Sequence, residues 1–184
     1  MNTQIKSIEI HRKAYEFVDA TCCAGMNLKG MAIKDLKRGT MIGPITNPPR
    51  KVKSFGAKLV VLDHPTKICK GYTPVLDTNT THMPCILKEI VKVKKSKRHQ
   101  HLMAELGEDC EFLASGDQAE VTFIPKMPLV IEALPDFPRY TRISLRDSGS
   151  VVAIGSCHGR EYDTTMDKAQ KAAIEKKKKL EKMA

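Results

Sequence analysis

Apolar residues between positions 57 and 156 recur in short runs that follow the two-residue period of β-strands. The runs are rich in β-branched residues and are separated by turn-forming residues. They span residues 57–62, 118–124, 129–134, 142–146 and 150–155, and two more strands are expected between residues 72 and 90, around residues 77–81. Many short strands without alternating helices predict a closed antiparallel β-barrel.

A second, shorter β-rich unit precedes this barrel. Residues 4–10 alternate polar and apolar side chains, which is typical of a half-buried strand. Residues 27–33 and 40–45 are weaker strand candidates. The Asn47-Pro48-Pro49-Arg50-Lys51 stretch is expected to be a linker, because consecutive prolines stiffen an extended chain.

The end of the chain changes from a strand pattern to a helical one. Thr164 to Asp167 has the spacing of a helix capping box, but the residues that follow carry little apolar stripe. Such a helix buries almost nothing, so we expect it to be frayed or disordered unless bound. The expected organisation is a first unit at residues 1–47, a linker at 48–51, the barrel at 52–157 and a basic tail at 158–184.

Positive charge is concentrated in two segments. Residues 88–101 hold six Lys or Arg against Glu89, and residues 168–184 hold seven Lys against Glu175 and Glu181, so each segment is net +5 and together they match the formal +10 of the chain. Such segments favour a nucleic acid or another acidic partner, but a solvated loop and a solubilising tail explain them equally well. The candidate binding cations are Lys94, Lys95, Lys97 and Arg98 in the first segment, and Lys176, Lys177, Lys178 and Lys179 in the second.

Composition argues against several classes of protein. No apolar stretch approaches the roughly 20 residues of a membrane-spanning helix, and the N-terminus lacks the apolar block of a secretory signal, so we expect a cytoplasmic protein without membrane contact. Aromatic residues make up 5% of the chain and Trp is absent, which disfavours stacking platforms for single-stranded nucleic acid. The six cysteines are expected to be free and mostly buried.

Motifs for catalysis or metal binding are missing. The sequence has neither a phosphate-binding glycine loop nor a Gly-x-Ser-x-Gly elbow. Cys157 and His158 are neighbours on an expected strand, which directs them to opposite faces. His99 and His101 fall in an expected polar loop without metal-ligand spacing. We therefore predict no catalytic residue, no metal site and no cofactor in this chain.

Three short motifs carry a resemblance to a known family. They are Leu62-Asp63-His64-Pro65, Gly71-Tyr72-Thr73-Pro74-Val75-Leu76-Asp77 and Thr80-Thr81-His82. Together they resemble the start of the third domain of translation elongation factor 1-alpha. Residues 5–11 and 33–39 are similar to later strands of that family's second domain, and the order of the motifs matches from about residue 4 to residue 156.

The resemblance implies the C-terminal part of an elongation factor, in which an incomplete second-domain barrel at residues 1–47 precedes the third-domain barrel. On this basis the chain is either a fragment or has its lost part supplied by another chain. GTP and magnesium are then expected only in the intact parent, a translational GTPase, and this chain alone is expected to have no activity. The implied partners are aminoacyl-tRNA, the ribosome and a guanine-nucleotide exchange factor, with actin or another acidic surface as a further candidate.

The alternative is a protein-interaction module. It would come from a related termination or ribosome-rescue GTPase, or be a stand-alone derivative that no longer binds tRNA. Cys22 and Cys23 favour such drift, because they stand where the family has an acidic residue and Asn in the pocket for the tRNA 3′ end.

By motif position, the resemblance also assigns roles to individual residues. Glu9 and Arg12 match the 3′-end pocket, although a cross-strand pair on a barrel surface is a nearly equal alternative. The candidate tRNA-backbone contacts are Asn79, Thr80, His82, Arg142, Arg146 and Arg160. Period two places Arg142 and Arg146 on the same strand face as Ser144, and a structural salt bridge is the even alternative for Arg146. We expect His64 and His82 to be packing or turn histidines.

Overall fold

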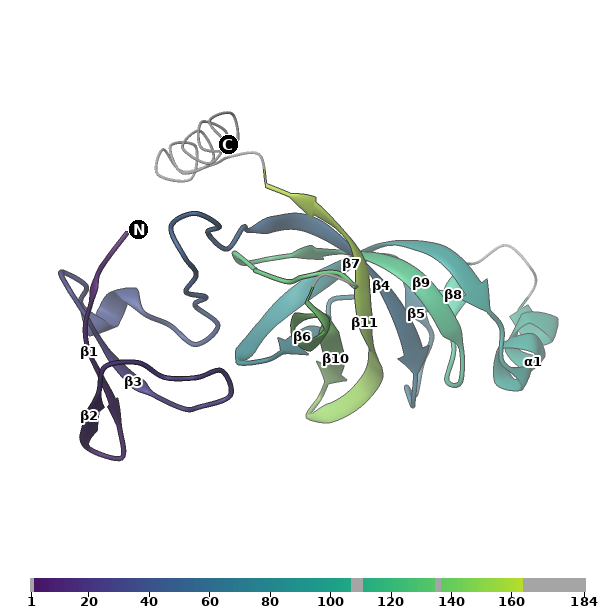
Figure 1. The fold of residues 1–184 in the computed structure, drawn as a ribbon. Coiled ribbons are helices and arrows are strands. Elements are labelled where there is room, and N and C mark those ends of the chain that lie inside the picture. The colour runs from purple at the N-terminus through teal and green to yellow at the C-terminus, as the bar shows by residue number, and fades with distance from the viewer. Residues whose placement is uncertain (1, 107–110, 135–136, 164–184) are drawn as a thin grey trace. The chain divides into compact units, whose positions relative to one another are not determined.

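The structure is a computed structural model that describes residues 2–106, 111–134 and 137–163. These residues form two compact units (Figure 1): unit 1 comprises residues 2–37 and 43–48, and unit 2 comprises residues 38–42 and 49–163. Among the described residues, no helix is both long enough and apolar enough to cross a membrane. The predicted helix after residue 163, with Lys176–Lys179, lies outside the described residues.

Unit 1 is a three-stranded antiparallel sheet with the order β2-β1-β3. Its elements are β1 (Ile5–Ile10), β2 (Lys13–Tyr15), β3 (Gly25–Leu28) and the short 3-10 helix η1 (Ile33–Asp35). The strand predicted at residues 4–10 is confirmed. His11 and Arg12, with φ of 49° and 65°, form a two-residue turn whose positive dihedral angles suit the right-handed twist of a hairpin.

The apolar side chains of unit 1 lie in solvent. None of the described residues of this unit is buried, and Phe17 and Ile33 are 75% and 91% exposed. A sheet of three strands needs a covering layer to bury an apolar face. Unit 1 therefore has no core of its own among the described residues.

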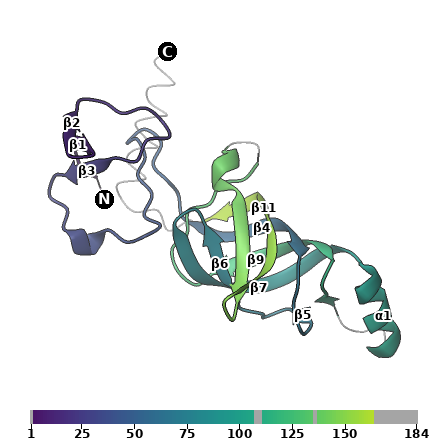
Figure 2. The same cartoon turned by 90° about the horizontal axis from the view of Figure 1, so that it is seen from below.

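Unit 2 is a closed six-stranded antiparallel barrel with the order β10-β11-β4-β9-β7-β6, which confirms the predicted all-β fold (Figure 2). Its strands are β4 (Val52–Val61), β6 (Val75–Thr78), β7 (Thr81–Lys94), β9 (Gln118–Pro125), β10 (Arg142–Asp147) and β11 (Ser150–Tyr162). A second small sheet pairs β5 (Ile68–Cys69) with β8 (Phe112–Leu113), and η2 (Pro138–Tyr140) is a 3-10 turn.

Alternate residues of each barrel strand fill the interior. Phe55 and Phe123 are each 1% exposed and their rings lie 5.6 Å apart across the β4–β9 pair. Burying a side chain of this size contributes about 1.5–3 kcal/mol. The inward half of the period-two pattern therefore supplies the core, and the outward half is left for contacts with solvent or partners.

Two predicted strands are absent, and one strand is longer than predicted. Residues 129–134 make only a single bridge, between Leu129 and Val52, while their buried residues join the barrel core. Residues 40–45 form no strand. In contrast, β11 continues to Tyr162, past the predicted end of the barrel at residue 157, because its last residues still pair with the start of β4.

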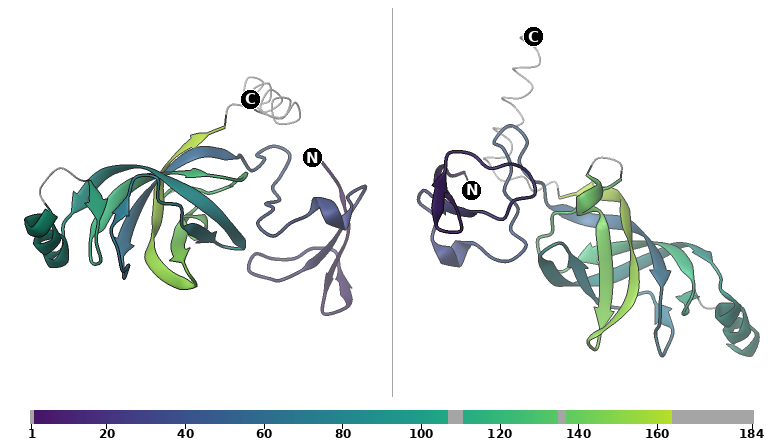
Figure 3. Two further views of the ribbon diagram at one scale, coloured as in Figure 1. Left: turned by 180° about the vertical axis from the view of Figure 1, so that it is seen from behind. Right: turned by 60° about the horizontal axis from the view of Figure 1, so that its bottom comes forward.

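The segment expected to be a polar loop around His99 and His101 is a helix, α1 (Lys97–Leu106), reached at the end of the long strand β7 (Figure 3). Ser96 caps its N-terminus, since the Ser96 hydroxyl accepts a hydrogen bond from the His99 amide at 3.2 Å. The His99 ring is buried, stacks on Phe112 with ring centroids 4.4 Å apart, and contacts Asp117 at 2.5 Å through Nδ1. A histidine therefore anchors this helix where an apolar stripe would normally do so.

Asp117 is the fully buried carboxylate that receives this anchor. It also accepts hydrogen bonds from the amides of Ser96 at 2.7 Å and Ala114 at 2.8 Å. Burial alone would raise the pKa of Asp117, but the hydrogen bonds from Ala114, Ser96 and His99 outweigh it and lower the pKa below the ordinary value. Asp117 therefore stays ionised and joins α1 to the barrel at the start of β9.

Replacement of Gly155 by Ala is expected to lower the free energy of unfolding of unit 2 by about 2 kcal/mol or more. A Cβ at this position would lie 2.0 Å from the carbonyl oxygen of Lys58 and 2.7 Å from the Leu59 side chain, where β11 crosses close to β4. The matched control is Gly159→Ala, since a Cβ there meets no atom within 4 Å. Urea denaturation measures both, and equal destabilisation by the two variants would contradict a steric origin.

Replacement of Asp117 by Asn is expected to destabilise the chain by about 3 kcal/mol at pH 7, because buried donors lose an ionised acceptor. The folded-state pKa of Asp117 lies below its unfolded value, so its contribution is fully present above about pH 4 and is lost as the pH falls through the folded pKa. Urea denaturation between pH 3 and pH 7 should therefore show a flatter pH dependence for D117N. The exposed Asp63→Asn variant serves as the control and should follow the wild type.

Candidate nucleic-acid interface

One edge of the barrel gathers most of the predicted tRNA-backbone residues around Asp77. On β6, Asp77 lies opposite His82 of β7 and Ser144 of β10. Its carboxylate contacts His82 Nδ1 at 2.5 Å and Arg146 Nε at 2.9 Å. Asp77 therefore fixes the orientations of the His82 and Arg146 side chains, which come from the two strands on either side of β6.

Arg146 was predicted to be either a tRNA-backbone contact or a partner in a structural salt bridge, and its ion pair with Asp77 does not exclude the first. The structural salt bridge is present, but the arginine side chain is 49% exposed and meets Asp77 through Nε. A guanidinium has five N–H donors, so the rest of the group can still bind a phosphate. Arg146 is thus a pre-oriented cation.

Arg142, Ser144 and Arg146 lie on the outer face of β10, as period two predicts, while Ile143 and Leu145 are buried. The side chain of Arg142 is exposed, and its backbone carbonyl accepts a hydrogen bond from the Thr78 hydroxyl at 2.9 Å. Asn79 and Thr80 are exposed in the two-residue turn between β6 and β7, where Asn79 has a φ of 50°. The edge therefore combines two arginines with the polar groups of a tight turn; we refer to Asn79, Thr80, His82, Arg142 and Arg146 as the β6–β10 edge.

Arg160 is not part of this edge. It lies near the end of β11, four residues or about 13 Å along the strand beyond Ser156, the partner of Arg142. Its guanidinium forms a 3.0 Å ion pair with Glu132, and both side chains are less than 20% exposed (16% and 18%). Arg160 also contacts the Tyr162 hydroxyl at 2.5 Å. These contacts give Arg160 a structural role in holding residues 129–134 against β11.

Glu9 and Arg12 are close in the sequence of unit 1, but no ion pair among the described residues joins them. Glu9 lies on β1 opposite Ala14 and Gly25, and Arg12 lies in the β1–β2 turn. Cys22 and Cys23 are exposed just before β3. The register pairs Glu9 with Gly25, the first residue of β3, two residues after Cys23.

The predicted basic segment divides between a strand and a helix. Lys94 ends β7, while Lys97 and Arg98 lie in the first turn of α1, and this turn contains no acidic residue. Lys95 contacts the Met103 sulfur, and Arg98 lies 4.0 Å from Asp63. These cations are exposed and held in place by the His99–Asp117 anchor.

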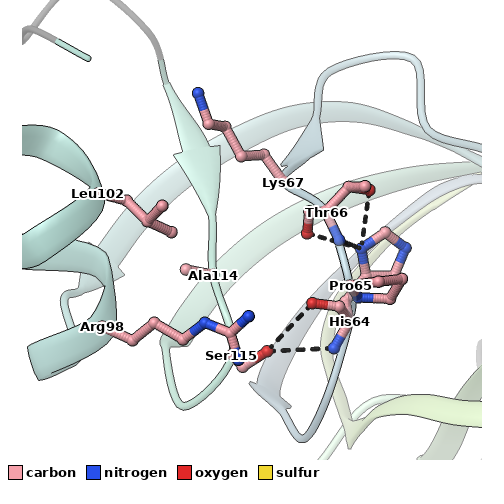
Figure 4. A pocket seen from close by; sticks show the side chains of 8 residues that line it. All are labelled: His64, Pro65, Thr66, Lys67, Arg98, Leu102, Ala114 and Ser115. Atoms are coloured by element: carbon pink, nitrogen blue, oxygen red, sulfur yellow. Dashed lines mark hydrogen bonds between the residues drawn. The ribbon is translucent and has the colours of Figure 1, made fainter. Parts of the chain in front are cut away.

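A pocket of about 440 Å³ lies between α1 and the chain that follows β4 (Figure 4). It is lined by His64, Pro65, Thr66, Lys67, Arg98, Leu102, Ala114 and Ser115. Its polar groups bond to one another: His64 Nδ1 contacts the Thr66 carbonyl at 2.7 Å, and Ser115 accepts from the His64 amide at 3.1 Å. His64 is only 7% exposed and is confirmed as a packing and turn histidine.

The five cysteines among the described residues are free, as predicted, but most of them are not buried. Among the described residues Cys22, Cys23 and Cys69 are exposed, and only Cys85 and Cys157 are buried. Burial raises the pKa of Cys85 to about 12 and that of Cys157 to about 11. Both buried thiols are therefore neutral and unreactive at neutral pH.

Sequence reasoning missed the two acidic residues that organise these surfaces. Asp77 is the last residue of the motif that begins at Gly71, and its position opposite His82 in a hairpin could have indicated the contact. Asp117 follows the tight Gly116 turn, but nothing in the sequence indicates that its partner is His99, 18 residues earlier. Both carboxylates orient basic side chains. A sum of charges along the sequence only subtracts them from the Lys and Arg total and does not show this role.

Comparison with known proteins agrees with this architecture. The family model described as GTP-eEF1A C-terminal domain-like matches residues 54–158. Elongation factor 1-alpha of Picrophilus torridus is 40% identical over 153 residues, covering 83% of this chain and 35% of the relative. The oocyte form of elongation factor 1-alpha from Xenopus laevis is 35% identical over 181 residues, covering 97% of this chain and 38% of the relative.

The fold also matches a solved structure of Sup35 complexed with GMPPNP. The TM-score is 0.73 at 18% sequence identity, over 88% of this chain and 38% of the Sup35 chain, which is a likeness of fold. The chain spans little more than a third of the length of the curated relatives it matches (35% and 38%). With the barrel matched over residues 54–158, the chain belongs to the family of GTP-eEF1A C-terminal domain-like proteins.

Proposed function

We propose that this chain is the tRNA-binding C-terminal part of a translation elongation factor 1-alpha that delivers aminoacyl-tRNA to the ribosome. In this proposal unit 2 holds the tRNA backbone through the β6–β10 edge, and unit 1 contributes Glu9 and Arg12 near the 3′ end. GTP and magnesium are bound by the remainder of the intact protein, and the exchange factor docks on the same assembly.

The Asp77-centred edge is the observation that carries the proposal. Arg146 is oriented by a carboxylate and Arg142 is exposed beside it on the same strand face. Hydroxyl and amide groups of Asn79 and Thr80 extend the donor set at the adjacent turn. Such contacts to phosphate fix position and add affinity without reading base sequence, which suits a carrier that accepts many tRNAs.

The edge lacks the features of the other common RNA-binding modes. The tRNA-backbone set contains no Phe, Tyr or Trp, and its one aromatic ring, His82, is held by Asp77, so bases have no extended stacking platform there. Its donors are fixed on paired strands and a two-residue turn, a geometry suited to a duplex of constant shape. A stem of tRNA is therefore the ligand that this edge supports best.

The alternative, a protein-interaction module without tRNA binding, is favoured by one observation. Cys22 and Cys23 are exposed at the position where the family resemblance expects an acidic residue and Asn. Thiols form poor hydrogen bonds, so recognition of the aminoacyl end would be weaker than recognition of the backbone.

Replacement of Arg142 and Arg146 by Gln is expected to weaken aminoacyl-tRNA binding by roughly tenfold for each arginine–phosphate interaction removed. The plot of log affinity against log salt should also become shallower by about one for each such interaction. Fluorescence titration of the full chain with labelled aminoacyl-tRNA at several salt concentrations measures both quantities.

The charge-matched control for these arginines is Arg139→Gln, an exposed arginine on η2. It should leave affinity and salt slope within about twofold of the wild type. Equal weakening by all three variants would show a general charge effect and contradict the proposed edge. Absence of tRNA binding by the wild-type chain, alone and joined to the GTP-binding part of an elongation factor 1-alpha, would leave the protein-interaction module.

A further inference from the structure

A second group of basic side chains lies on the outside of the barrel, across β4, β9 and β7. We define the lysine face as Lys58, Lys92 and Lys94 with Gln118 and Glu120 between them. The strand register sets Lys58 and Lys92 on either side of Glu120, and Lys94 next to Gln118. These residues line a shallow depression of about 260 Å³ together with Leu59, Val60 and Ala119.

The lysine face carries a surplus of positive charge. Glu120 is its single carboxylate, and it pairs with Lys58 at 3.1 Å, whose hydrogen bond and charge lower the pKa of Glu120. Lys92 and Lys94 are exposed and have no ion pair among the described residues. At neutral pH the face therefore presents two further ammonium groups beside a Lys–Glu pair.

The spacing of these cations is fixed by strands. Neighbouring strands lie about 4.8 Å apart and alternate residues of one strand about 7 Å apart. Lys58 and Lys92, two strands apart, are thus anchored about 10 Å from each other, with Lys94 one strand repeat further. A nucleic-acid duplex carries about one negative charge per 1.7 Å of its axis, so several phosphates fall within reach of this array at once.

Two further features favour the backbone of a duplex over other anions. The face has no aromatic side chain, so it offers no stacking for unpaired bases. Its cations are lysines, compact charges that suit phosphate oxygens without demanding the planar geometry of a carboxylate fork. The same charge continues along the chain into Lys95 and Lys97 beyond the end of β7.

The lysine face and the β6–β10 edge share strand β7 but lie at different positions along it. His82 of the edge is near the start of β7 and pairs with β6, whereas Lys92 and Lys94 are at its end and pair with β9. Ten residues, or roughly 33 Å of extended strand, separate His82 from Lys92. The two sets of cations are therefore separate clusters on the barrel.

We propose that the lysine face is a second RNA-backbone site, which binds the phosphates of a duplex RNA near the end of β7 that lies away from the β6–β10 edge. This inference goes beyond the proposed tRNA contact and does not depend on it. The barrel then acts as a rigid spacer between two RNA segments, each held by charge and shape.

The test is binding of a labelled RNA hairpin with a stem of about 16 base pairs, unrelated to tRNA, to the full chain across a salt series. Replacing Lys92 and Lys94 together by Gln is expected to raise Kd by about tenfold or more and to reduce the salt slope by about two. The matched control replaces Lys70 and Lys126, two exposed lysines outside the face, by Gln. Both variants keep the seven lysines of residues 168–184, so the background from that segment is equal.

The control variant should bind the hairpin within about twofold of the wild type. Equal weakening in K92Q/K94Q and K70Q/K126Q would show a net-charge effect and overturn the proposal, as would unchanged binding by K92Q/K94Q. Competition by poly-glutamate at lower concentration than by the hairpin would identify an acidic protein as the ligand and also overturn it. Thermal melting of each variant should match the wild type. A variant with Lys92→Gln and Lys94→Arg should bind the hairpin more tightly than K92Q/K94Q does.

Discussion

Closure of the six-stranded sheet determines where every functional side chain points. β10 pairs with β6 on one side and β11 on the other, and β11 approaches β4 so closely that Gly155 has no room for a Cβ. Once the ring is closed, inward residues are committed to the core and outward ones to the surface. The β6–β10 edge and the lysine face are therefore consequences of the same register, at two positions on one barrel.

Carboxylates then decide how the basic groups behave. Asp77 holds His82 and Arg146, Glu132 holds Arg160, and buried Asp117 holds the His99 anchor of α1. In each case the acid lies on a different segment from its partner. The position of one segment therefore determines the orientation of a side chain on another. Net charge therefore says little about which cations are available: Arg160 is committed to structure, while Arg142 is exposed.

The two-residue pattern predicted the fold where a strand has one face in the core and one in solvent, as in β10 with Ile143 and Leu145 inward. It failed at residues 129–134, because alternation reports burial and not pairing: Leu129 and Ile131 are buried with one bridge only. It also failed at α1, whose inward contact is one histidine. For the site, motif order singled out residues that the strand pairing places on or between β6, β7 and β10, whereas the Glu132 partner of Arg160 needs three-dimensional information.

The two basic surfaces differ in how they would hold RNA. At the β6–β10 edge, Asp77 restricts Arg146 and so reduces the rotamer freedom given up when a phosphate binds, at the cost of part of its charge. On the lysine face, Lys92 and Lys94 keep their full charge and their freedom, so attraction is longer in range but less exact in geometry. An oriented edge suits one duplex of fixed shape, and an unrestrained face tolerates several. At the edge an Asp orients Arg146, whereas on the lysine face the one carboxylate, Glu120, pairs with Lys58 and leaves Lys92 and Lys94 without an ion pair in the part of the chain that the structure describes. This difference points to one shape-selective contact and one electrostatic contact on the same barrel.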